Sequence, residues 1–307
     1  MDRLNPFQAI YDECNKSMSK KALTTGIIFP RCVDIELTNT CNMRCRMCPT
    51  GQGQLKRPQG IMDRKVFHAI LEQVQEHDCA IRFIRWGEPL LHPMLPSFIK
   101  ECVERNVKVH INTNGLLMSE HLNELFCEYP LTSIKFSFQG LVGDEYYYWR
   151  GVRYFATLIE KMGALHKCRG DREFPYISCG TTIEAETQLA KERFLAKVLP
   201  YCDGAYIGIT KDLQKVNLSH YTTQCPEVFD KLSIDWDGQV TACCSDYDRK
   251  MIVGDATKTR LEDIWKCKQI DFYRFKIASG KFMDLDLCSK CPRPNDDMRS
   301  RFHTKVQ

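Results

Sequence analysis

The stretch that decides the fold reads Thr38-Asn39-Thr40-Cys41-Asn42-Met43-Arg44-Cys45-Arg46-Met47-Cys48-Pro49. Its three cysteines are spaced C-x3-C-x2-C, in a polar segment that ends in proline. Three thiolates on one loop can bind three irons of a 4Fe–4S cluster, because soft sulfur ligands favour Fe–S clusters or zinc. A closed zinc site needs a fourth ligand nearby, and the next cysteine and histidine are only Cys79 and His68. The loop therefore predicts a cluster with one open iron.

Composition restricts the class of protein. The chain has 307 residues with 43 basic and 39 acidic side chains, a net charge of +4 that does not argue for nucleic acid. It contains neither a long apolar run nor an N-terminal apolar leader, so we expect a cytoplasmic protein that does not enter a membrane. Seventeen cysteines in a chain of this length indicate metal binding rather than a disulfide scaffold.

Apolar periodicity predicts strands that alternate with helices. The strands fall at 33–37, 80–86, 107–111, 133–138, 176–183 and 205–209. The helices fall at 64–76, which Asp63 would cap, and at 93–105, 119–128, 152–168 and 187–199. The strand at 33–37 alternates apolar and acidic residues, as a half-buried strand does. This order is typical of a parallel β/α barrel or a doubly wound sheet.

The three-cysteine loop resembles the signature of the radical S-adenosylmethionine (SAM) superfamily, with Met47 where an aromatic residue is usual. The resemblance implies an α/β fold with a partial (β/α)6 TIM-like barrel over 32–214. Residues 1–31, whose apolar spacing predicts a short amphipathic helix, would precede it as an external strap. It also implies that SAM binds the open iron and is cleaved reductively to a 5′-deoxyadenosyl radical, which abstracts a hydrogen atom from the substrate. An external one-electron reductant such as flavodoxin or ferredoxin would supply the electron.

Segments that follow later strands resemble the SAM-binding segments of this superfamily. Arg85-Trp86-Gly87-Glu88-Pro89 resembles the family's G-G-E-P, with Trp86 replacing the first glycine. Asn112-Thr113-Asn114-Gly115 contains its T-N-G, and Ser137-Phe138-Gln139-Gly140 resembles its S-x-D-G, with glutamine for the acid. The SAM-binding residues that the resemblance implies are Trp86, Gly87, Glu88, Asn114, Ser137, Thr181 and Ile207.

Two arginines are candidate catalytic residues. Arg85 lies near the end of the second predicted strand. Arg150 lies in Tyr146-Tyr147-Tyr148-Trp149-Arg150-Gly151, a segment that often faces the substrate in relatives of the family. The aromatic run equally fits an ordinary helix start. Glu88 and His92 lie in suitable loops as well, so the sequence does not single out a general base.

A second set of cysteines follows residue 214: Cys225, Cys243, Cys288 and Cys291. Residues 232–241 predict a hairpin that turns at Asp237-Gly238 and delivers Cys243, and residues 259–279 predict a helix. Four thiolates could hold zinc or a fully ligated 4Fe–4S cluster, and spacing leaves both open.

The spacing C-x12-G-x4-C, which includes Gly238, resembles the start of the SPASM domain that follows some radical SAM barrels. No cysteine follows Cys291, as in the shorter twitch form of that domain. The resemblance implies a small twitch/SPASM-like domain over 215–307 with one auxiliary 4Fe–4S cluster. Cys244 competes with Cys243 as the ligand.

The resemblance implies oxidation of an alcohol on a small polyol, amino-sugar or sugar conjugate, with the auxiliary cluster as electron acceptor. Dehydration or epimerisation of a similar substrate, or modification of a peptide, are alternatives. Only about 31 residues precede the first strand, too few for a peptide-binding winged helix. The SAM-binding segments argue against a non-catalytic metal-binding module.

Overall fold

The computed structural model describes residues 3–17, 29–184, 187–210, 225, 227–291 and 301–304. Six parallel strands are hydrogen-bonded in sequence order. They are β1 (Cys32–Ile35), β2 (Ala80–Phe83), β3 (Val109–Thr113), β4 (Ser133–Ser137), β5 (Tyr176–Ile183) and β6 (Gly204–Ile209). The connecting helices are α3 (Arg64–Glu76), α4 (Leu95–Glu104), α5 (Glu120–Glu128), α6 (Gly143–Arg150), α7 (Phe155–Arg169) and α8 (Gln188–Val198).

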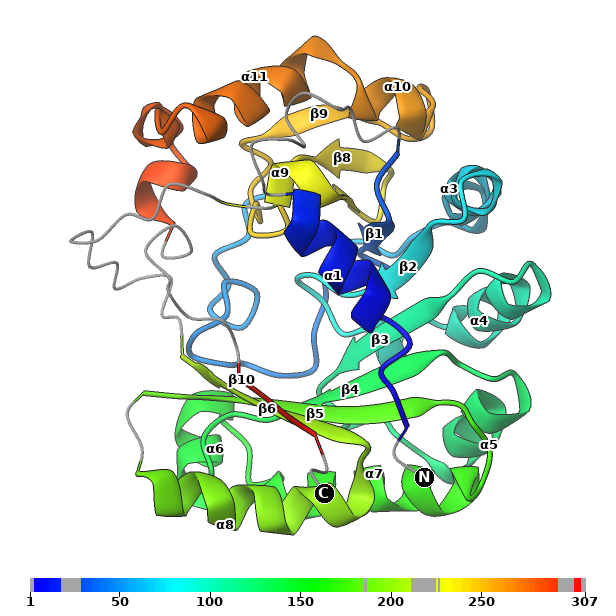
Figure 1. Ribbon diagram of the computed structural model, residues 1–307, viewed down its shortest axis with the longest axis vertical. Helices are drawn as coiled ribbons and strands as arrows, with labels where there is room; N and C mark the ends of the chain where they lie inside the picture. Colours follow the sequence, from blue (N-terminus) through cyan, green and yellow to red (C-terminus); the bar gives the residue numbers. More distant parts are fainter. Residues whose placement is uncertain are drawn as a thin grey trace.

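The strands curve into an arc with α3, α4, α5, α7 and α8 on its outer face (Figure 1). The alternation of strands and helices thus predicted a parallel α/β fold correctly, and the partial barrel is the form that the family resemblance implied. Asp63 caps α3 as expected, because its carboxylate accepts from the backbone N–H of Lys65 at 2.7 Å. Short 3-10 helices occur at η1 (Pro89–Leu91), η2 (Leu199–Tyr201), η3 (Phe282–Asp284) and η4 (Cys288–Lys290).

The first strand differs from its expected half-burial, because every residue of β1 is buried. Val33 and Ile35 belong to the apolar core on one face. On the other face, the Asp34 carboxylate accepts from Arg82 Nε at 2.7 Å and Nη2 at 2.9 Å. A buried charge needs such a partner, and this one comes from the neighbouring strand β2.

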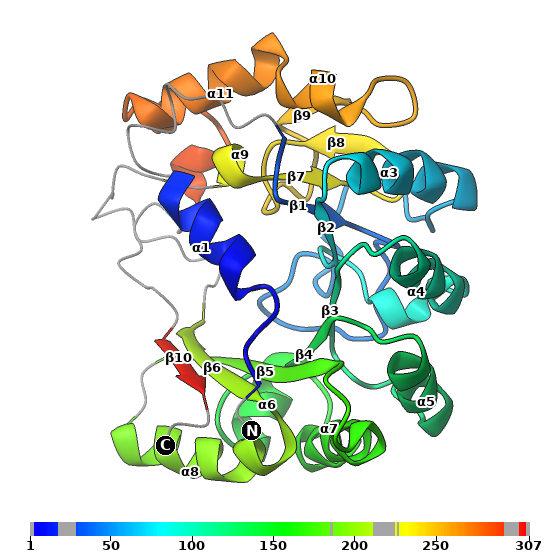
Figure 2. The same ribbon diagram turned by 45° about the vertical axis from the view of Figure 1, so that its right-hand side comes forward.

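Helix α1 (Gln8–Ser17) lies across the inner face of the arc instead of forming an external strap (Figure 2). Phe7, which precedes it, is fully buried against Cys32 and Ala80, and its ring centroid lies 5.5 Å from that of His110. These three partners come from the beginnings of β1 and β2 and from β3. The N-terminal segment therefore covers the interior of the barrel at the amino-terminal ends of these strands.

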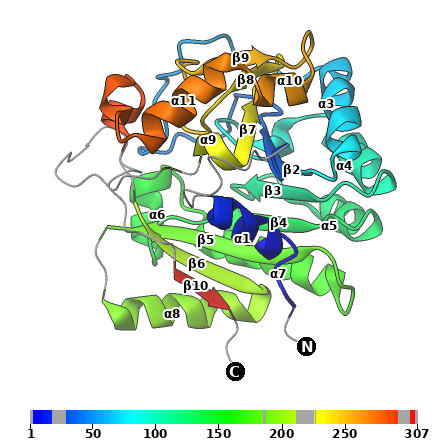
Figure 3. The same ribbon diagram turned by 45° about the horizontal axis from the view of Figure 1, so that its top comes forward.

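The second cysteine region continues the same sheet. Strand β7 (Lys231–Ile234) pairs in parallel with β1, and β8 (Gln239–Thr241) and β9 (Ile252–Asp255) follow antiparallel. The predicted hairpin is therefore present, and Gly238 adopts φ +89° in its turn. At the opposite edge, β10 (Arg301–Thr304) runs antiparallel to β6 (Figure 3).

The single helix expected over 259–279 is two helices, α10 (Leu261–Trp265) and α11 (Lys268–Ala278). A further short helix, α9 (Glu227–Asp230), comes directly before β7. Cys267 separates α10 from α11 because its backbone is extended, with φ −72° and ψ 154°. Helices α10 and α11 lie beside β8 and β9 (Figure 1). No helix among the described residues combines the length and apolarity that crossing a bilayer requires.

Candidate active site

The three-cysteine loop follows β1 at the carboxyl end of the sheet and is held at its beginning against the residues that come after it. Asn39 Nδ2 donates to Pro58 O at 2.8 Å, and Asn39 Oδ1 accepts from Gly60 N at 2.9 Å. In between, Arg46 N donates to Trp149 O at 2.8 Å, which ties the loop to the end of α6. Function sits at this end of the strands in barrels of this kind.

Two of the predicted site residues donate to the sulfurs of the loop. Arg150 Nη1 lies 3.6 Å from Cys45 Sγ, and Asn114 Nδ2 lies 3.8 Å from Cys41 Sγ. Burial raises the pKa of Cys41 to about 11 and also raises the pKa of Cys45. A metal must therefore displace the protons of these thiols.

The end of β2 packs directly on the loop, backbone against backbone. A Cβ on Gly87 would stand 1.9 Å from Thr38 O and 2.8 Å from Thr40 O, so glycine is required there. Glu88 N donates to Thr40 O at 2.9 Å, and Trp86 O accepts from Thr50 Oγ1 at 2.5 Å. The predicted segment Trp86–Glu88 therefore lies against the three-cysteine loop.

The Glu88 carboxylate joins the ends of β2 and β3. It is 3% exposed and accepts from Leu90 N at 3.1 Å, Thr113 Oγ1 at 2.7 Å and Asn114 N at 2.8 Å. Burial raises the pKa of Glu88, and these donors oppose the rise. The side chain thus holds Asn114 beside the loop.

The remaining SAM-binding predictions divide between the two faces of the sheet. Ser137 on β4 pairs with Gly180 on the inner face, and within the described part of the chain its hydroxyl has no hydrogen bond. Thr181 comes one residue after Gly180 and pairs with Ile207. Because side chains alternate along a strand, both of these point to the outer face of the sheet. Thr181 Oγ1 donates to Gly140 O at 2.5 Å, and Ile207 belongs to the apolar core. Their side chains do not join the group around the loop.

Lys135 is an inner-face residue that sequence reasoning missed. A Cβ on Gly180 would stand 3.4 Å from Lys135 Cδ, so the lysine stem runs along that glycine toward the level of Ser137. Its ammonium lies 5.9 Å from the Tyr206 ring centroid. Burial, followed by the charge of Arg82, lowers the pKa of Lys135 to about 8. The polar positions of Ser133-Ile134-Lys135-Phe136-Ser137 alternate, and this signal could have revealed it.

The other candidate residues have hydrogen-bond partners. His92 Nε2 contacts Met62 O at 2.9 Å, and its Nδ1 accepts from Met94 N at 3.2 Å. Burial lowers the pKa of His92. Arg150 Nη2 donates to Phe138 O at 3.0 Å, which turns this side chain from α6 toward the end of β4.

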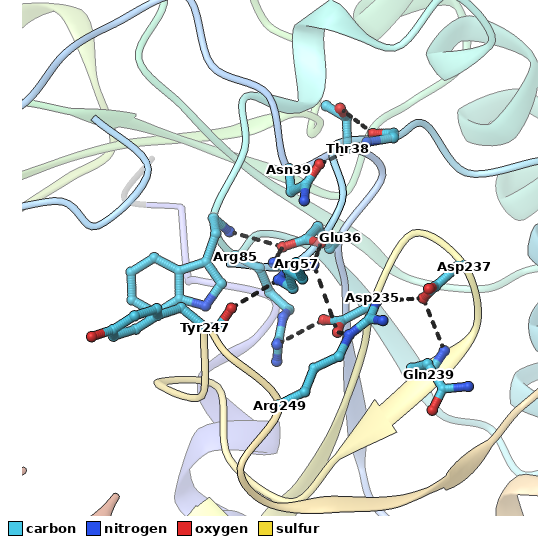
Figure 4. A network of polar contacts seen from close by, with 12 residues as sticks. Glu36, Thr38, Asn39, Arg57, Arg85, Asp235, Asp237, Gln239, Tyr247 and Arg249 are labelled. Carbon is cyan, nitrogen blue, oxygen red and sulfur yellow. Dashed lines mark hydrogen bonds and ion pairs between the residues drawn. The ribbon is translucent and has the colours of Figure 1, made fainter. Parts of the chain in front are cut away.

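Arg85 lies in a buried network between the two cysteine regions (Figure 4). Its side chain is fully buried, and Nη2 donates to Asp235 Oδ1 at 2.8 Å while Nη1 donates to Thr241 Oγ1 at 3.2 Å. The backbone of Arg85 has φ +137°, a rare value for a residue with a side chain. This placement favours a positioning role over the catalytic role predicted for Arg85.

Asp235 is the centre of that network and was not predicted. Arg249 Nε donates to its carboxylate at 2.7 Å, and Arg57 Nη1 approaches it at 3.6 Å. Arg57 also donates to both Glu36 oxygens at 2.5 Å (Figure 4). Since Glu36 follows β1 and Asp235 follows β7, the network joins the ends of two paired strands.

The second cysteine set comes from separate segments. Cys225 precedes α9, Cys243 follows β8, Cys288 begins η4, and Cys291 follows it. Burial raises the pKa of Cys288 to about 12, and the nearby Cys291 and Asp246 add to the rise. Asp246 N also donates to Cys243 O at 3.1 Å, so Asp246 connects Cys243 with Cys288.

A side-chain hydrogen bond with Cys243, followed by burial, raises the pKa of Cys244, so the two thiols lie beside each other. Among the residues that the structure describes, no three His, Cys, Asp or Glu side chains converge on a single-ion site. Each thiolate of a four-iron cluster binds a different iron, so its sulfurs stand further apart than the ligands of one ion.

Comparison with known proteins agrees with this arrangement. Residues 35–191 match the radical SAM superfamily, and residues 225–292 match an iron–sulfur cluster-binding domain. The S-adenosyl-L-methionine-dependent 2-deoxy-scyllo-inosamine dehydrogenase of Niallia circulans is 24% identical, over 84% of this chain and 91% of that protein. A tungsten-containing aldehyde ferredoxin oxidoreductase cofactor-modifying protein of Pyrococcus furiosus is also 24% identical, over 83% and 86%.

Solved structures share the fold. The crystal structure of BtrN in complex with AdoMet and 2-DOIA has a TM-score of 0.59 at 18% identity, covering 88% of this chain and 98% of that chain. Streptococcus suis SuiB bound to precursor peptide SuiA has a TM-score of 0.67 at 14% identity, covering 94% and 76%.

Proposed function

Because the chain belongs to the radical SAM superfamily, we propose that it is a dehydrogenase that oxidises a secondary alcohol to a ketone. We propose a small polyol, amino-sugar or sugar conjugate as the substrate. One observation carries this proposal: the likeness to the inosamine dehydrogenase extends through 84% of this chain, well beyond the barrel. The set of four C-terminal cysteines supports it, because oxidation needs an acceptor for a second electron.

The family implies a 4Fe–4S cluster with SAM in the barrel and a further iron–sulfur cluster in the C-terminal region. The residues fit these groups, because both donor sets consist of thiols and because N–H groups of Arg150 and Asn114 face the sulfurs of Cys45 and Cys41. We propose Cys41, Cys45 and Cys48 as ligands of the first cluster. The proposed ligands of the auxiliary cluster are Cys225, Cys243, Cys288 and Cys291.

When bound, SAM and the two clusters supply a radical that removes one hydrogen atom from the alcohol carbon and an acceptor for one electron. The substrate must also lose its hydroxyl proton to become a ketone, and that transfer falls to the protein. Per ketone, the alcohol thus loses one hydrogen atom, one proton and one electron. An external one-electron reductant would supply the electron that SAM cleavage consumes.

We propose Lys135 as the group that takes the hydroxyl proton. Glu88 already accepts three hydrogen bonds, both ring nitrogens of His92 have partners, and a guanidinium does not deprotonate in proteins. Among the described residues, the Lys135 ammonium has neither a hydrogen bond nor an ion pair. The titratable or charged groups around it are Arg82, Asp34, His110, Cys179 and Tyr206. Its lowered pKa makes a neutral amine available just above neutral pH.

The test uses the reconstituted full chain with SAM and dithionite under anaerobic conditions, against a panel of polyols and amino-sugars. We expect one 5′-deoxyadenosine for each ketone formed. A dehydrated or epimerised product would show that the enzyme is a dehydratase or an epimerase and not a dehydrogenase. Turnover of peptides alone would indicate a peptide-modifying maturase. Absence of 5′-deoxyadenosine would contradict radical chemistry altogether.

Lys135→Met separates the proton transfer from the radical step. We expect ketone formation to fall about 10²–10⁴-fold, whereas deuterium from a labelled alcohol carbon still reaches 5′-deoxyadenosine. The wild-type rate should rise with pH through about 8 as the amine loses its proton, and the variant should lose this rise. Lys100→Met, on the exposed side of α4, is the matched control. An unchanged pH profile in Lys135→Met would exclude this role.

A further inference from the structure

The three-cysteine loop turns one side to solvent. Arg44 and Arg46 flank Cys45 and are exposed, whereas the Cys45 side chain is 6% exposed. The other side of the loop is covered by the end of β2, where Gly87 touches Thr38. The exposed side therefore leads from solvent to the loop that carries the cysteines.

Helix α6 extends this exposed side with tyrosines that arginines cover. Arg46 lies 4.4 Å from the ring centroid of Tyr148, and Arg153 lies 4.5 Å from that of Tyr147. Both rings remain accessible, Tyr148 at 51% and Tyr147 at 45%. We call Arg44, Arg46, Arg153, Tyr147 and Tyr148 the Arg–Tyr face.

The Arg–Tyr face is held in place and is positively charged. The bond from Arg46 N to Trp149 O at 2.8 Å joins the loop to α6. Two carboxylates lie nearby: Asp144 pairs with Arg153 at 3.3 Å, and Glu145 accepts from Leu141 N at 2.6 Å. The Arg–Tyr face thus presents three guanidinium groups to solvent. Of the two nearby carboxylates, only that of Asp144 is exposed.

We propose that the Arg–Tyr face docks an acidic protein that carries single electrons, of the flavodoxin or ferredoxin type. The inference rests on the proposed function, because radical formation takes one electron per event and the carrier is oxidised by one electron. Arginine and tyrosine are enriched at protein interfaces, and a positive face accelerates encounter with an acidic partner. Docking here brings the redox group of the carrier next to the loop that holds Cys45.

The test compares two reductants on one variant. In Arg44→Glu/Arg46→Glu, we expect the initial rate of 5′-deoxyadenosine formation with limiting reduced flavodoxin to fall about 10-fold or more. The rate with dithionite, a small reductant that needs no protein interface, should stay within about twofold of wild type. Wild-type turnover with flavodoxin should slow as salt rises, because screening weakens the attraction.

Two controls make the outcome decisive. Lys100→Glu/Lys108→Glu places the same charge change on α4 and before β3, away from the Arg–Tyr face, and should leave both rates unchanged. Arg44→Gln/Arg46→Gln, checked for iron content, covers the case in which the charge reversal disturbs the loop. An unchanged flavodoxin rate, or an equal loss with dithionite in both variants, would overturn the proposal. Failure of the wild type with dithionite would instead count against the proposed function.

Discussion

The two cysteine regions are built in opposite ways. Cys41, Cys45 and Cys48 lie on one loop, which the ends of β2, β3 and α6 hold through backbone and side-chain contacts. The second set is distributed between residues 225 and 291, so the site proposed for it would assemble only when β7, β8 and η4 have folded. A metal site can thus be a local motif or a product of tertiary structure, and the two kinds of site respond differently to mutation.

The buried network around Asp235 joins these regions. Arg85 comes from the end of β2 and Arg57 from the loop that follows the three cysteines. In the second region, Asp235 lies in the turn between β7 and β8, and Arg249 follows β8. A contact set of this kind transmits disturbance from either side to the other. The comparison therefore predicts local effects for cysteine changes and shared effects for changes in the network.

The largest effect is expected from single ligands. Cys45→Ala should abolish 5′-deoxyadenosine formation and lower iron from about eight to about four per chain, whereas Cys243→Ala should lose the other irons and retain 5′-deoxyadenosine. Cys244→Ala and Cys102→Ala, a fully buried cysteine of α4, should change neither quantity. Loss of 5′-deoxyadenosine in Cys243→Ala would show that the two regions do not act separately.

A smaller effect, shared by both regions, is expected from Asp235→Asn. The change leaves buried guanidiniums without their carboxylate, which costs about 3–5 kcal/mol in the free energy of unfolding. Iron should fall at both sites, because the network supports both. Asp144→Asn removes an exposed pair with Arg153 and should cost about 0–1 kcal/mol. Urea unfolding measures the loss of unfolding free energy in both variants. Equal losses would contradict the claim that Asp235 holds the buried network together.

The smallest effect, confined to the first region, is expected from Gly87→Ala. The new methyl group meets the backbone of Thr38, and parting the two segments should cost about 1–3 kcal/mol and weaken SAM binding. Gly53→Ala is the contrast, since Gly53 has φ +67° but open space around it. It should cost about 1 kcal/mol through backbone strain alone and leave SAM affinity unchanged. Equilibrium dialysis with SAM separates these outcomes.

Periodicity predicted much of the barrel. The helix at 64–76 and the strand at 176–183 occur with the expected bounds, because one has a clear apolar face and the other is a long continuous strand. The three-cysteine loop was found because its ligands are contiguous. The turn at Asp237-Gly238 was found because its chemistry is local.

What the sequence missed depends on partners that are distant along the chain. Glu36 meets Arg57 21 residues away, and Arg85 meets Asp235 150 residues away, so no local pattern marks either carboxylate as buried. The positive φ of Arg85 turns its side chain toward the second region, which a motif comparison does not reveal. Thr181 and Ile207 follow the alternation of their strands away from the loop, and Lys135 follows it inward.

The parallel pairing of β7 with β1 has a consequence for biosynthesis. Residues 32–35 leave the ribosome long before residues 231–234, so the nascent chain carries β1 with one of its edges unpaired. An unpaired strand edge is a template for aggregation. Completion of the last third of the polypeptide closes that edge, so the segment after the barrel also protects the newly made barrel from other copies of itself.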